Sequence, residues 1–454
     1  MNADEHGLNE LYEFSTFAFI RVHLWIKNSI KLKMAEKFDV IIVGAGPSGC
    51  AAAYSLAKMG FHVLVVERGK YPGAKNVMGG RMYAYALNRL IPDFWKEAPV
   101  ERCVTHEKLT LLSSKSSVTL DFQDEEFLEL PNSFTILRAR FDQWFANKAV
   151  EAGATLIPNI RVDDLLWKDK RVVGIVAGTD KLEANVVIAA DGAVSLMAEK
   201  AGLKKFLAKE FAIGMKEIIE LPEKVIEDRF NLASGEGAAQ LFIGQCTKQI
   251  QGGAFIYTNR TSLSLGIVVY IKQLIESKVE AYELMREFNS NPAIEKLIAG
   301  GKLVEYSAHV IPEASRTGLF TDGLLVVGDA AGLLVNSGIT LRGMDMAIAS
   351  GMAAAEASKH ALEKQDFSKK SLSHYEHLLK NDFVLADIHT FKRSPAFLQN
   401  TRLYSLYPEL ACKLFHRLAL VKGPKKRLFD ELLEETKGKR IQMVRDLIKG
   451  FRSM

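Results

Sequence analysis

The chain has 454 residues, more than one hydrophobic core usually serves, so we expect two or three subdomains. A content of 48% hydrophobic and 25% charged residues is typical of a globular protein, and a net charge of +5 is too small to indicate nucleic-acid binding. Four separated cysteines without a CxxC pair favour a reducing compartment and indicate no metal site: Cys50, Cys103, Cys246 and Cys412. No run reaches the ~18 apolar residues of a membrane-spanning helix, so we expect a cytoplasmic protein or one peripheral to the cytoplasmic face of a membrane.

Residues 1–33 do not have the pattern of a signal peptide, because they begin with acidic residues and lack a small-residue cleavage site. An aromatic-rich stretch covers residues 14–26, and Met34 stands four residues before the first predicted strand. We expect this extension either to lie upstream of the true start or to form a short amphipathic arm that contacts a partner or a membrane. The pattern leaves both open.

The first strong motif is an apolar strand that runs into a glycine-rich turn and a helix, over residues 38–59. Gly44 is expected to make the tight turn, Gly46 to let the backbone approach a pyrophosphate, and Gly49 to let the helix pack on the sheet. The helix N-terminus offers unpaired N–H groups to phosphate. A second strand ends at Glu67, which is placed to accept hydrogen bonds from ribose hydroxyls. The motif therefore predicts an adenine dinucleotide site formed by Gly44, Ala45, Gly46, Pro47, Ser48, Gly49 and Glu67.

The glycine-rich and basic residues 68–81 show no periodicity and are expected to fold back over an extended cofactor through Arg68, Gly79 and Gly80. A plain crossover loop is the alternative. A helix is predicted over residues 138–152, with Arg138 and Asp142 one turn apart. This pair is either a surface ion pair or a device that holds Arg138 near the phosphate or ribityl oxygens of a cofactor.

Two later strands end in an acid beside a glycine, at Asp191-Gly192 and at Gly328-Asp329. Ligands of open α/β sheets bind where parallel strands end. A helix start near residues 337–340, which includes Gly338 and Thr340, would stabilise negative charge on a reduced ring. Three strand-end motifs in this order favour FAD over NAD as the cofactor.

The predicted fold class is α/β, with an FAD-binding Rossmann-like domain of the glutathione-reductase type, an inserted antiparallel-sheet substrate domain and a helical C-terminal region. Residues 205–310 alternate strands with polar turns and show one long helical stretch near 271–289. The expected divisions are 35–108, 134–204 and 311–362 for the FAD-binding domain, 109–133 and 205–310 for the antiparallel-sheet domain, and 363–454 for the helical region.

In its motifs the chain resembles the electron-transfer flavoprotein:quinone oxidoreductase family, especially its bacterial nitrogen-fixation-associated branch. The resemblance covers about residues 36–440 and is most specific at residues 73–83, 137–144, 252–259, 328–332 and 338–345. It implies FAD, electron input from the alpha and beta subunits of an electron-transfer flavoprotein, and a quinone as acceptor.

Longer relatives in this family carry a four-iron cluster on cysteines near the C-terminus, where this chain has only Cys412. The resemblance therefore implies a separate small ferredoxin-like subunit that supplies the iron-sulfur cluster. The basic residues 422–427 could contact such a partner or anionic lipid, although a solvated charged surface explains them equally simply.

We expect the quinone between the flavin and the sheet that carries Gly252, Gly253, Phe255 and Tyr257, although these aromatic side chains fit a core as well. No catalytic residue can be named from the pattern. Prenyl reductases of related fold are the nearest alternative, but they typically carry a Tyr-x-Trp-x-Phe-Pro segment where this chain has residues 254–259. A prenyl-binding escort protein without FAD and an NAD(P)H-dependent aromatic hydroxylase are further alternatives.

Overall fold

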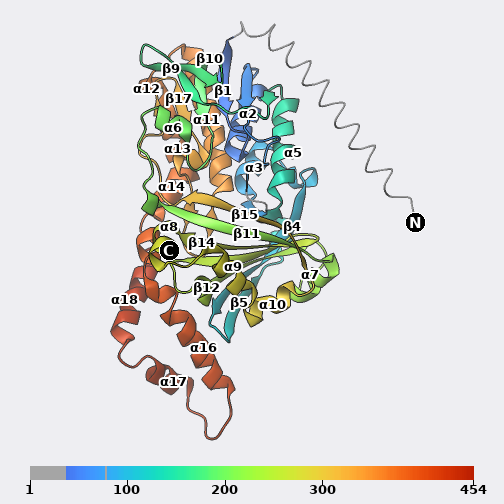
Figure 1. Cartoon of the computed structure of the whole chain (residues 1–454), viewed down its shortest axis with the longest axis vertical. Coiled ribbons are helices and arrows are strands. Elements are labelled where there is room, and N and C mark those ends of the chain that lie inside the picture. Colours follow the sequence, from blue (N-terminus) through green and yellow to red (C-terminus); the bar gives the residue numbers. More distant parts are fainter. Residues whose placement is uncertain (1–36, 77–78) are drawn as a thin grey trace, which may run out of the picture.

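The computed structural model describes residues 37–76 and 79–454. The expectations for residues 1–33 lie outside this part of the chain. Figure 1 shows an elongated molecule with one sheet near one end, a second sheet across the middle, and helices α16 to α18 at the opposite end.

The first sheet is a mostly parallel, eight-stranded sheet. β1 pairs in parallel with β10 and β2, and their last residues align, so that Val43 lies beside Ala189 and Val66. All four residues of β2 are buried, and burial of each such side chain contributes roughly 1.5–3 kcal/mol. In order the strands are β16 (Phe320–Thr321), β17 (Leu324–Val326), β10 (Asp180–Ala189), β1 (Phe38–Val43), β2 (Val63–Val66) and β7 (Thr155–Ile157), with β8 (Asp164–Lys168) and β9 (Arg171–Ala177) pairing beside β10.

Helix α2 (Pro47–Lys58) packs between α5 (Arg138–Glu151) and α11 (Met344–Lys364). Small residues make the close approach of α11 possible: a Cβ atom on Gly351 would lie 2.2 Å from the Ser48 carbonyl oxygen. The helix predicted after the glycine-rich turn and the helix predicted over 138–152 are both present, the second ending one residue earlier, at Glu151. Together with the parallel sheet they form the expected Rossmann-like domain.

The second sheet has nine strands. It is the expected antiparallel sheet except at one pair, where β12 runs parallel to β4. The chain can form the parallel pair because more than 120 residues separate the two strands and allow a long crossover. In order the strands are β15 (Lys302–Pro312), β11 (Phe211–Glu220), β14 (Ser262–Tyr270), β13 (Gly252–Thr258), β12 (Glu236–Gly244), β4 (Val100–Leu112), β6 (Ser133–Ile136) and β3 (Gly80–Tyr83), with β5 (Ser117–Gln123) beside β4.

The division into sheets differs from the expected domain boundaries. β3, β4 and β6 belong to the second sheet, although residues 80–108, which include most of β4, and residues 134–136 were expected in the FAD-binding domain. The reason is that β4 is one continuous strand of 13 residues, which the expected boundary at residue 108 would cut. One face of this sheet is covered by several short helices, where one long helical stretch was expected: α7 (Glu223–Phe230), α8 (Ile271–Ser277), α9 (Ala281–Asn289) and α10 (Pro292–Ile298).

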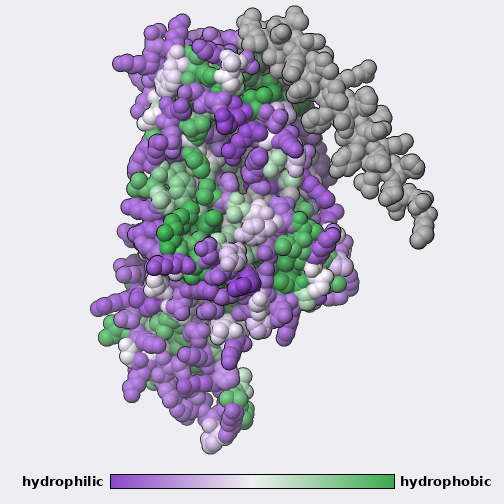
Figure 2. Space-filling view, in the orientation of Figure 1, coloured by the Kyte–Doolittle hydropathy of each residue, from purple (hydrophilic) through white to green (hydrophobic). Residues whose placement is uncertain are grey.

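The C-terminal region is helical, as expected, and reaches furthest from the first sheet (Figure 1). The face in Figure 2 is mostly hydrophilic, with hydrophobic side chains in separate areas. No helix in residues 37–76 and 79–454 is long and apolar enough to cross a membrane. The helices of this region are α12 (Lys369–Leu372), α13 (His374–Asn381), α14 (Phe383–Thr390), α15 (Ser394–Leu398), α16 (Leu406–Ala419), α17 (Leu428–Glu435) and α18 (Arg440–Phe451).

Candidate functional site

The three glycines of the first motif differ in the space around them. A Cβ atom on Gly44, whose φ is +107°, would lie 2.4 Å from the Ala190 carbonyl oxygen, and one on Gly49 would lie 2.0 Å from the Gly44 carbonyl oxygen. A Cβ atom on Gly46 would meet nothing within 4 Å. Gly44 and Gly49 are thus required by packing within the protein, whereas Gly46 leaves open space on the side where a ligand would approach.

The N-terminus of α2 provides a cradle for a diphosphate. Gly46 is the N-cap residue, and no side chain caps the helix, while Pro47 occupies its first position. Free N–H groups and the positive end of the helix dipole favour an anion at this place. The residues present therefore fit the pyrophosphate of FAD, which supplies a ring able to accept and release electrons when it is bound.

Glu67 lies at the end of β2, as expected, and its carboxylate is buried against the glycine turn. Oε2 accepts a hydrogen bond of 2.9 Å from the Ala45 N–H, and Oε1 accepts one of 2.6 Å from the Gly69 N–H. Each carboxylate oxygen retains further acceptor capacity, so contact with ribose hydroxyls stays compatible with this arrangement. The structure adds a role in fixing the turn itself.

Gly328, which follows β17, lies against the start of α2 beside the same glycine turn. Its φ is +58°, its N–H donates to Ser350 Oγ at 2.9 Å, and a Cβ atom on it would lie 2.7 Å from Ser48 Oγ. Asp329 follows in the short 3₁₀ helix η4 (Gly328–Ala331). Burial raises the pKa of Asp329, while His309 and Arg138 act in the opposite direction. The third expected motif therefore lies beside the first.

Asp191 stands at the end of β10, and its Cα would be 3.4 Å from a Cβ atom on Gly44. Its carboxylate is already bonded within the protein, accepting hydrogen bonds from Ser195 Oγ at 2.7 Å and from the Met197 N–H at 2.9 Å. The Asp191-Gly192 backbone reaches the expected corner, but the side chain orders the turn before α6 (Leu196–Lys200).

Arg138 and Asp142 form a bidentate ion pair at the start of α5, with both N···O distances 2.8 Å. Asp142 is buried and also accepts a 2.6 Å hydrogen bond from Asn76 Nδ2. The pair is therefore not an ordinary surface ion pair. The positive charge of Arg138 acts to lower the pKa of Asp329, so the start of α5 lies near the third strand-end motif.

Gly80 is the first residue of β3 in the second sheet, and Gly79 directly precedes it. Gly79 has a φ of +75°, and a Cβ atom on it would lie 2.2 Å from Ser264 Oγ. Its carbonyl oxygen accepts a 2.6 Å hydrogen bond from Lys216 Nζ on β11. Arg68, further back in the same loop, is exposed and lies close enough to His309 to lower the pKa of that imidazole.

The expected substrate residues on β13 divide into two kinds. Cβ atoms on Gly252 and Gly253 would lie 2.0 Å from the Val268 carbonyl oxygen and 3.0 Å from the Phe242 carbonyl oxygen, so sheet packing alone explains both glycines. The rings of Phe255 and Tyr257 stack with centroids 4.7 Å apart. Phe255 also lies 5.1 Å below Lys216 Nζ, which places it next to the Gly79 peptide.

The expectation of a helix start at residues 337–340 is wrong. These residues form the turn between the two-residue strands β18 (Val335–Asn336) and β19 (Leu341–Arg342), where the Ser337 N–H donates to the Thr340 carbonyl oxygen. Helix α11 begins later, at Met344. A Cβ atom on Gly338 would lie 3.0 Å from Leu398 and 3.4 Å from Met454, so Gly338 packs against the C-terminal region, whereas Thr340 bonds within the turn to Ser337.

Two residues of this site were not predicted from the sequence, Lys216 and His309. Lys216 lies between Gly214 and Ile218 on one face of β11, where the period of two predicts another apolar or small residue. That break in the alternation was the available signal. His309, on the neighbouring strand β15, has its pKa lowered by burial and by the cations Arg138, Arg68 and Lys216, against the influence of Asp329.

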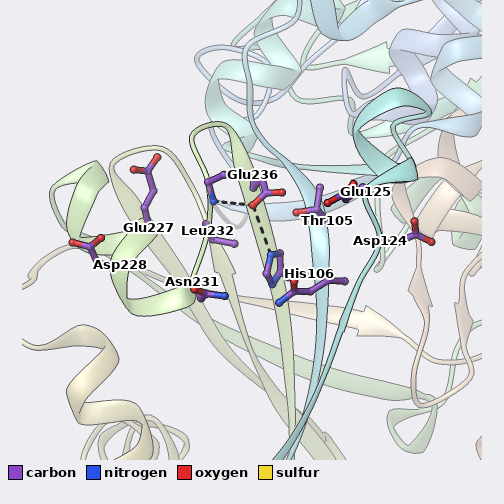
Figure 3. A pocket seen from close by; sticks show the side chains of 11 residues that line it. Thr105, His106, Asp124, Glu125, Glu227, Asp228, Asn231, Leu232 and Glu236 are labelled. Carbon is purple, nitrogen blue, oxygen red and sulfur yellow. Dashed lines mark hydrogen bonds and ion pairs between the residues drawn. The ribbon is translucent and has the colours of Figure 1, made fainter.

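A pocket of about 500 Å³ opens elsewhere, between β4, β12 and α7 (Figure 3). Its carboxylates are largely engaged within the protein: Glu227 lies 3.4 Å from Arg102, and Asp228 lies 2.9 Å from Lys224. Glu236 accepts a hydrogen bond from the Ala233 N–H and lies 3.7 Å from His106 Nε2. In the described residues no group of histidine, cysteine or carboxylate side chains has the arrangement of a metal site, and the four cysteines are free and separate.

Comparison with known proteins places the chain in a class. A family model described as FAD dependent oxidoreductase matches residues 39–234, one described as ETF-QO, ubiquinone-binding, matches residues 211–311, and one for the ETF-QO/FixC family C-terminal domain matches residues 394–454. The solved structure of a geranylgeranyl bacteriochlorophyll reductase-like protein from Thermoplasma acidophilum is similar in fold, with a TM-score of 0.70, 22% identity, and coverage of 91% of this chain and 99% of that one. The fold and the glycine corners are those of an FAD-dependent oxidoreductase.

The relatives define the family more closely. Protein FixC of Salmonella typhi is 48% identical over 391 residues, or 85% of this chain and 91% of the relative. Protein FixC of Escherichia coli K12 is 46% identical, and the probable electron transfer flavoprotein-quinone oxidoreductase YdiS of the same strain is 42% identical, each with 91% of this chain and 98% of the relative covered. The chain belongs to the electron-transfer flavoprotein:quinone oxidoreductase family, with its FixC members among the relatives.

Proposed function

We propose that this protein accepts electrons from the alpha and beta subunits of an electron-transfer flavoprotein onto bound FAD and passes them to a quinone. The observation that carries the proposal is the match of residues 211–311 to a ubiquinone-binding model. These residues form the part of the second sheet that carries Lys216 and Phe255, which lie beside the Gly79 peptide. Flavin suits this exchange, since it handles one- and two-electron steps.

The cofactor residues in this proposal come from seven separate segments of the chain. The turn of β1 and α2 receives the pyrophosphate, Glu67 the adenosine ribose, and the ends of β10 and β17 the rest of the sugar chain. Arg138 and the Gly79 peptide lie on the side of the ring. The proposed set is Gly44, Ala45, Gly46, Pro47, Ser48, Gly49, Glu67, Arg68, Gly79, Gly80, Arg138, Asp191, Gly192, Gly328, Asp329, Gly338 and Thr340.

The proposal assigns the iron-sulfur cluster to a separate small ferredoxin-like subunit. Its support is that Cys412 contacts carbonyl oxygens of Leu111 and Ser116 and has no second cysteine close to it among the described residues. Four thiolates must converge on such a cluster. Purified chain is expected to contain flavin without iron.

Contact with a membrane surface or a partner is proposed for the C-terminal helices. Phe429, Ile441 and Phe451 are 65%, 72% and 83% exposed, although they are large apolar side chains. Basic residues 422–427 lie in the same region. A peripheral protein on the cytoplasmic face of a membrane would use such a surface, and no role with nucleic acid is proposed.

An anaerobic spectroscopic experiment tests the proposal. Purified holoprotein is mixed with the reduced electron-transfer flavoprotein, and a short-chain ubiquinone analogue is then added. Flavin bleaching in the first step and recovery of the oxidised spectrum in the second are expected. Failure of every quinone analogue to restore the spectrum would contradict the quinone as acceptor, and consumption of a geranylgeranyl substrate instead would favour a prenyl reductase.

A further inference from the structure

Lys216 is unusual among the residues between the two sheets. Strand β11 turns Met215 into the core beneath the short helices, whereas Lys216 faces the opposite way. Its Nζ donates a 2.6 Å hydrogen bond to the Gly79 carbonyl oxygen and lies 5.1 Å from the centroid of the Phe255 ring. The ammonium group is therefore held at a fixed place beside the Gly79–Gly80 peptide.

The charge of Lys216 is not compensated by an acid. Burial and then Arg138 lower its pKa to about 7, and no carboxylate among the described residues acts in the other direction. On the neighbouring elements, Arg138 is already paired with Asp142, and Asp329 faces His309 and Arg138. Directly beside Lys216 in the sheet are Gly266 on β14 and Ser307 on β15, which are both uncharged.

An uncompensated cation in a partly desolvated position destabilises the protein unless a negative charge arrives there. Reduction supplies such a charge: oxidised flavin takes up two electrons and one proton and leaves the ring with one negative charge. A fixed cation beside that ring stabilises the reduced form more than the neutral oxidised form. The Gly79–Gly80 peptide, which Lys216 holds, belongs to the set proposed above for the cofactor.

We propose that Lys216 is a positioning residue that holds the Gly79 peptide and, through its positive charge, stabilises the reduced flavin relative to the oxidised flavin. This inference rests on the proposed binding of FAD between the two sheets. It does not depend on the identity of the electron donor or acceptor, because the charge acts on the flavin itself.

The midpoint potential of the bound flavin tests this role. Holoprotein is titrated anaerobically with dithionite in the presence of reference dyes, for the native chain and for Lys216→Met, Lys216→Gln and Lys216→Arg. Lys216→Met is expected to favour the oxidised flavin at least tenfold more than the native chain does, which is about 30 mV for a two-electron couple. Lys216→Arg keeps the charge and is expected to keep the potential close to the native value.

Lys216→Gln removes the charge but keeps a polar side chain with N–H donors, one bond shorter than lysine, whereas Lys216→Met removes both the charge and the donor. A lowered potential in the Lys216→Gln variant supports the proposal, and a native potential in both Lys216→Gln and Lys216→Met overturns it. Lys224→Met, which removes an exposed lysine paired with Asp228, is the matched control and should not shift the potential. A native holoprotein that cannot reduce quinone would contradict the proposed function, yet the potentials would still decide the role of Lys216.

Discussion

At the scale of single residues, Gly46 differs from the other glycines of its turn because its own backbone does not require glycine. Its φ of −77° and ψ of 179° are accessible to any residue, and a Cβ atom there would contact no protein atom within 4 Å. Gly44 and Gly49, in contrast, are enclosed by backbone carbonyl groups. A ligand that approaches closely is the remaining reason for glycine at position 46.

The change Gly46→Ala therefore tests ligand approach without disturbing the fold. We expect the free energy of unfolding of the variant apoprotein to lie within about 0.5 kcal/mol of the native value. We expect the variant to bind FAD at least about tenfold more weakly, a loss of ~1.4 kcal/mol of binding free energy. Calorimetric titration and thermal unfolding measure the two quantities. Gly49→Ala is the contrasting variant, since its Cβ would lie 2.0 Å from a carbonyl oxygen and should destabilise the apoprotein itself.

Lys216 gives a second prediction, on the pH dependence of stability. Its pKa is about 7 in the folded apoprotein and near 10.4 in an unfolded chain, so the unfolded chain binds more protons between these values. The free energy of unfolding should therefore rise as the pH rises from about 7 to 10. Below pH 7 the destabilisation by the buried charge of Lys216 should be at its maximum. Lys216→Met should lack this rise and be more stable at pH 7 by roughly 2 kcal/mol, less than the full pKa shift implies, because the side chain is partly solvated.

Chemical unfolding of both apoproteins between pH 7 and pH 10 provides the comparison. Parallel pH profiles for the native chain and Lys216→Met would show that Lys216 is not held in an unfavourable position. The same substitution is expected to change the midpoint potential of the flavin. Lys216 would therefore destabilise the apoprotein and stabilise the reduced flavin in the holoprotein.

At the scale of elements, the crossing of α2 and α11 links the glycine turn to the long helix behind it. Gly351 on α11 contacts the Ser48 carbonyl, and Ser350 Oγ accepts the hydrogen bond from the Gly328 N–H. Displacement of α11 would therefore move two of the three strand-end motifs together.

Gly351→Ala is predicted to disturb this crossing. The added methyl group would lie 2.2 Å from the Ser48 carbonyl oxygen and 3.0 Å from the Ala51 side chain, so we expect destabilisation of about 1–3 kcal/mol and weaker FAD binding. Gly343→Ala, just before the same helix, places its Cβ in open space and serves as the control. Equal thermal stability of the two variants would contradict the account of this crossing.

The packing of α13 on α11 carries a pH-dependent element. The rings of His360 and His374 stack with centroids 4.6 Å apart, and His377 follows at 6.1 Å from His374. Burial, and then the neighbouring histidines, lower the pKa of His374. The folded protein therefore binds a proton at His374 less readily than the unfolded chain does. The free energy of unfolding should be highest above about pH 6.5 and should fall as the pH drops below that value.

The fall of the melting temperature between pH 7.5 and pH 5.5 is predicted to be smaller in His374→Gln than in the native chain, by about 1–3 °C. His389→Gln, which alters an exposed histidine on α14, should retain the native pH profile. An unchanged profile in His374→Gln would refute this assignment.

At the scale of the whole molecule, the sequence predicts those elements whose pattern of residues is local, such as a fixed glycine spacing or an apolar periodicity. The glycine turn, the helix from Arg138 and the buried strands follow spacing and periodicity within one segment, and they are confirmed. The parallel pairing of β4 with β12 depends on contacts between distant segments, which no local pattern encodes. The sequence predicts a helix start at residues 337–340, where the structure has a turn, because serine and threonine are common both before helices and in turns.

The part of the candidate site on the parallel sheet could also be predicted from local motifs. Gly44, Gly49, Gly328 and the Asp191 backbone come together because their strands are neighbours in a parallel sheet, which the motif order implies. Lys216 and the inward-facing His309 were missed, since a side chain's direction depends on strand register in the second sheet. The contact between the two sheets is therefore the part of the site that needed a structure.

The central claim is that three strand ends form one site for the whole FAD molecule, with its pyrophosphate on α2 and its adenosine ribose at Glu67. Calorimetric titration of the apoprotein with FAD and with FMN tests this claim most directly, because FMN lacks the adenylate half. The account predicts one FAD bound per chain and FMN binding at least about a hundredfold weaker, ~2.7 kcal/mol. Equal affinity for FMN, or no binding of FAD, would contradict it.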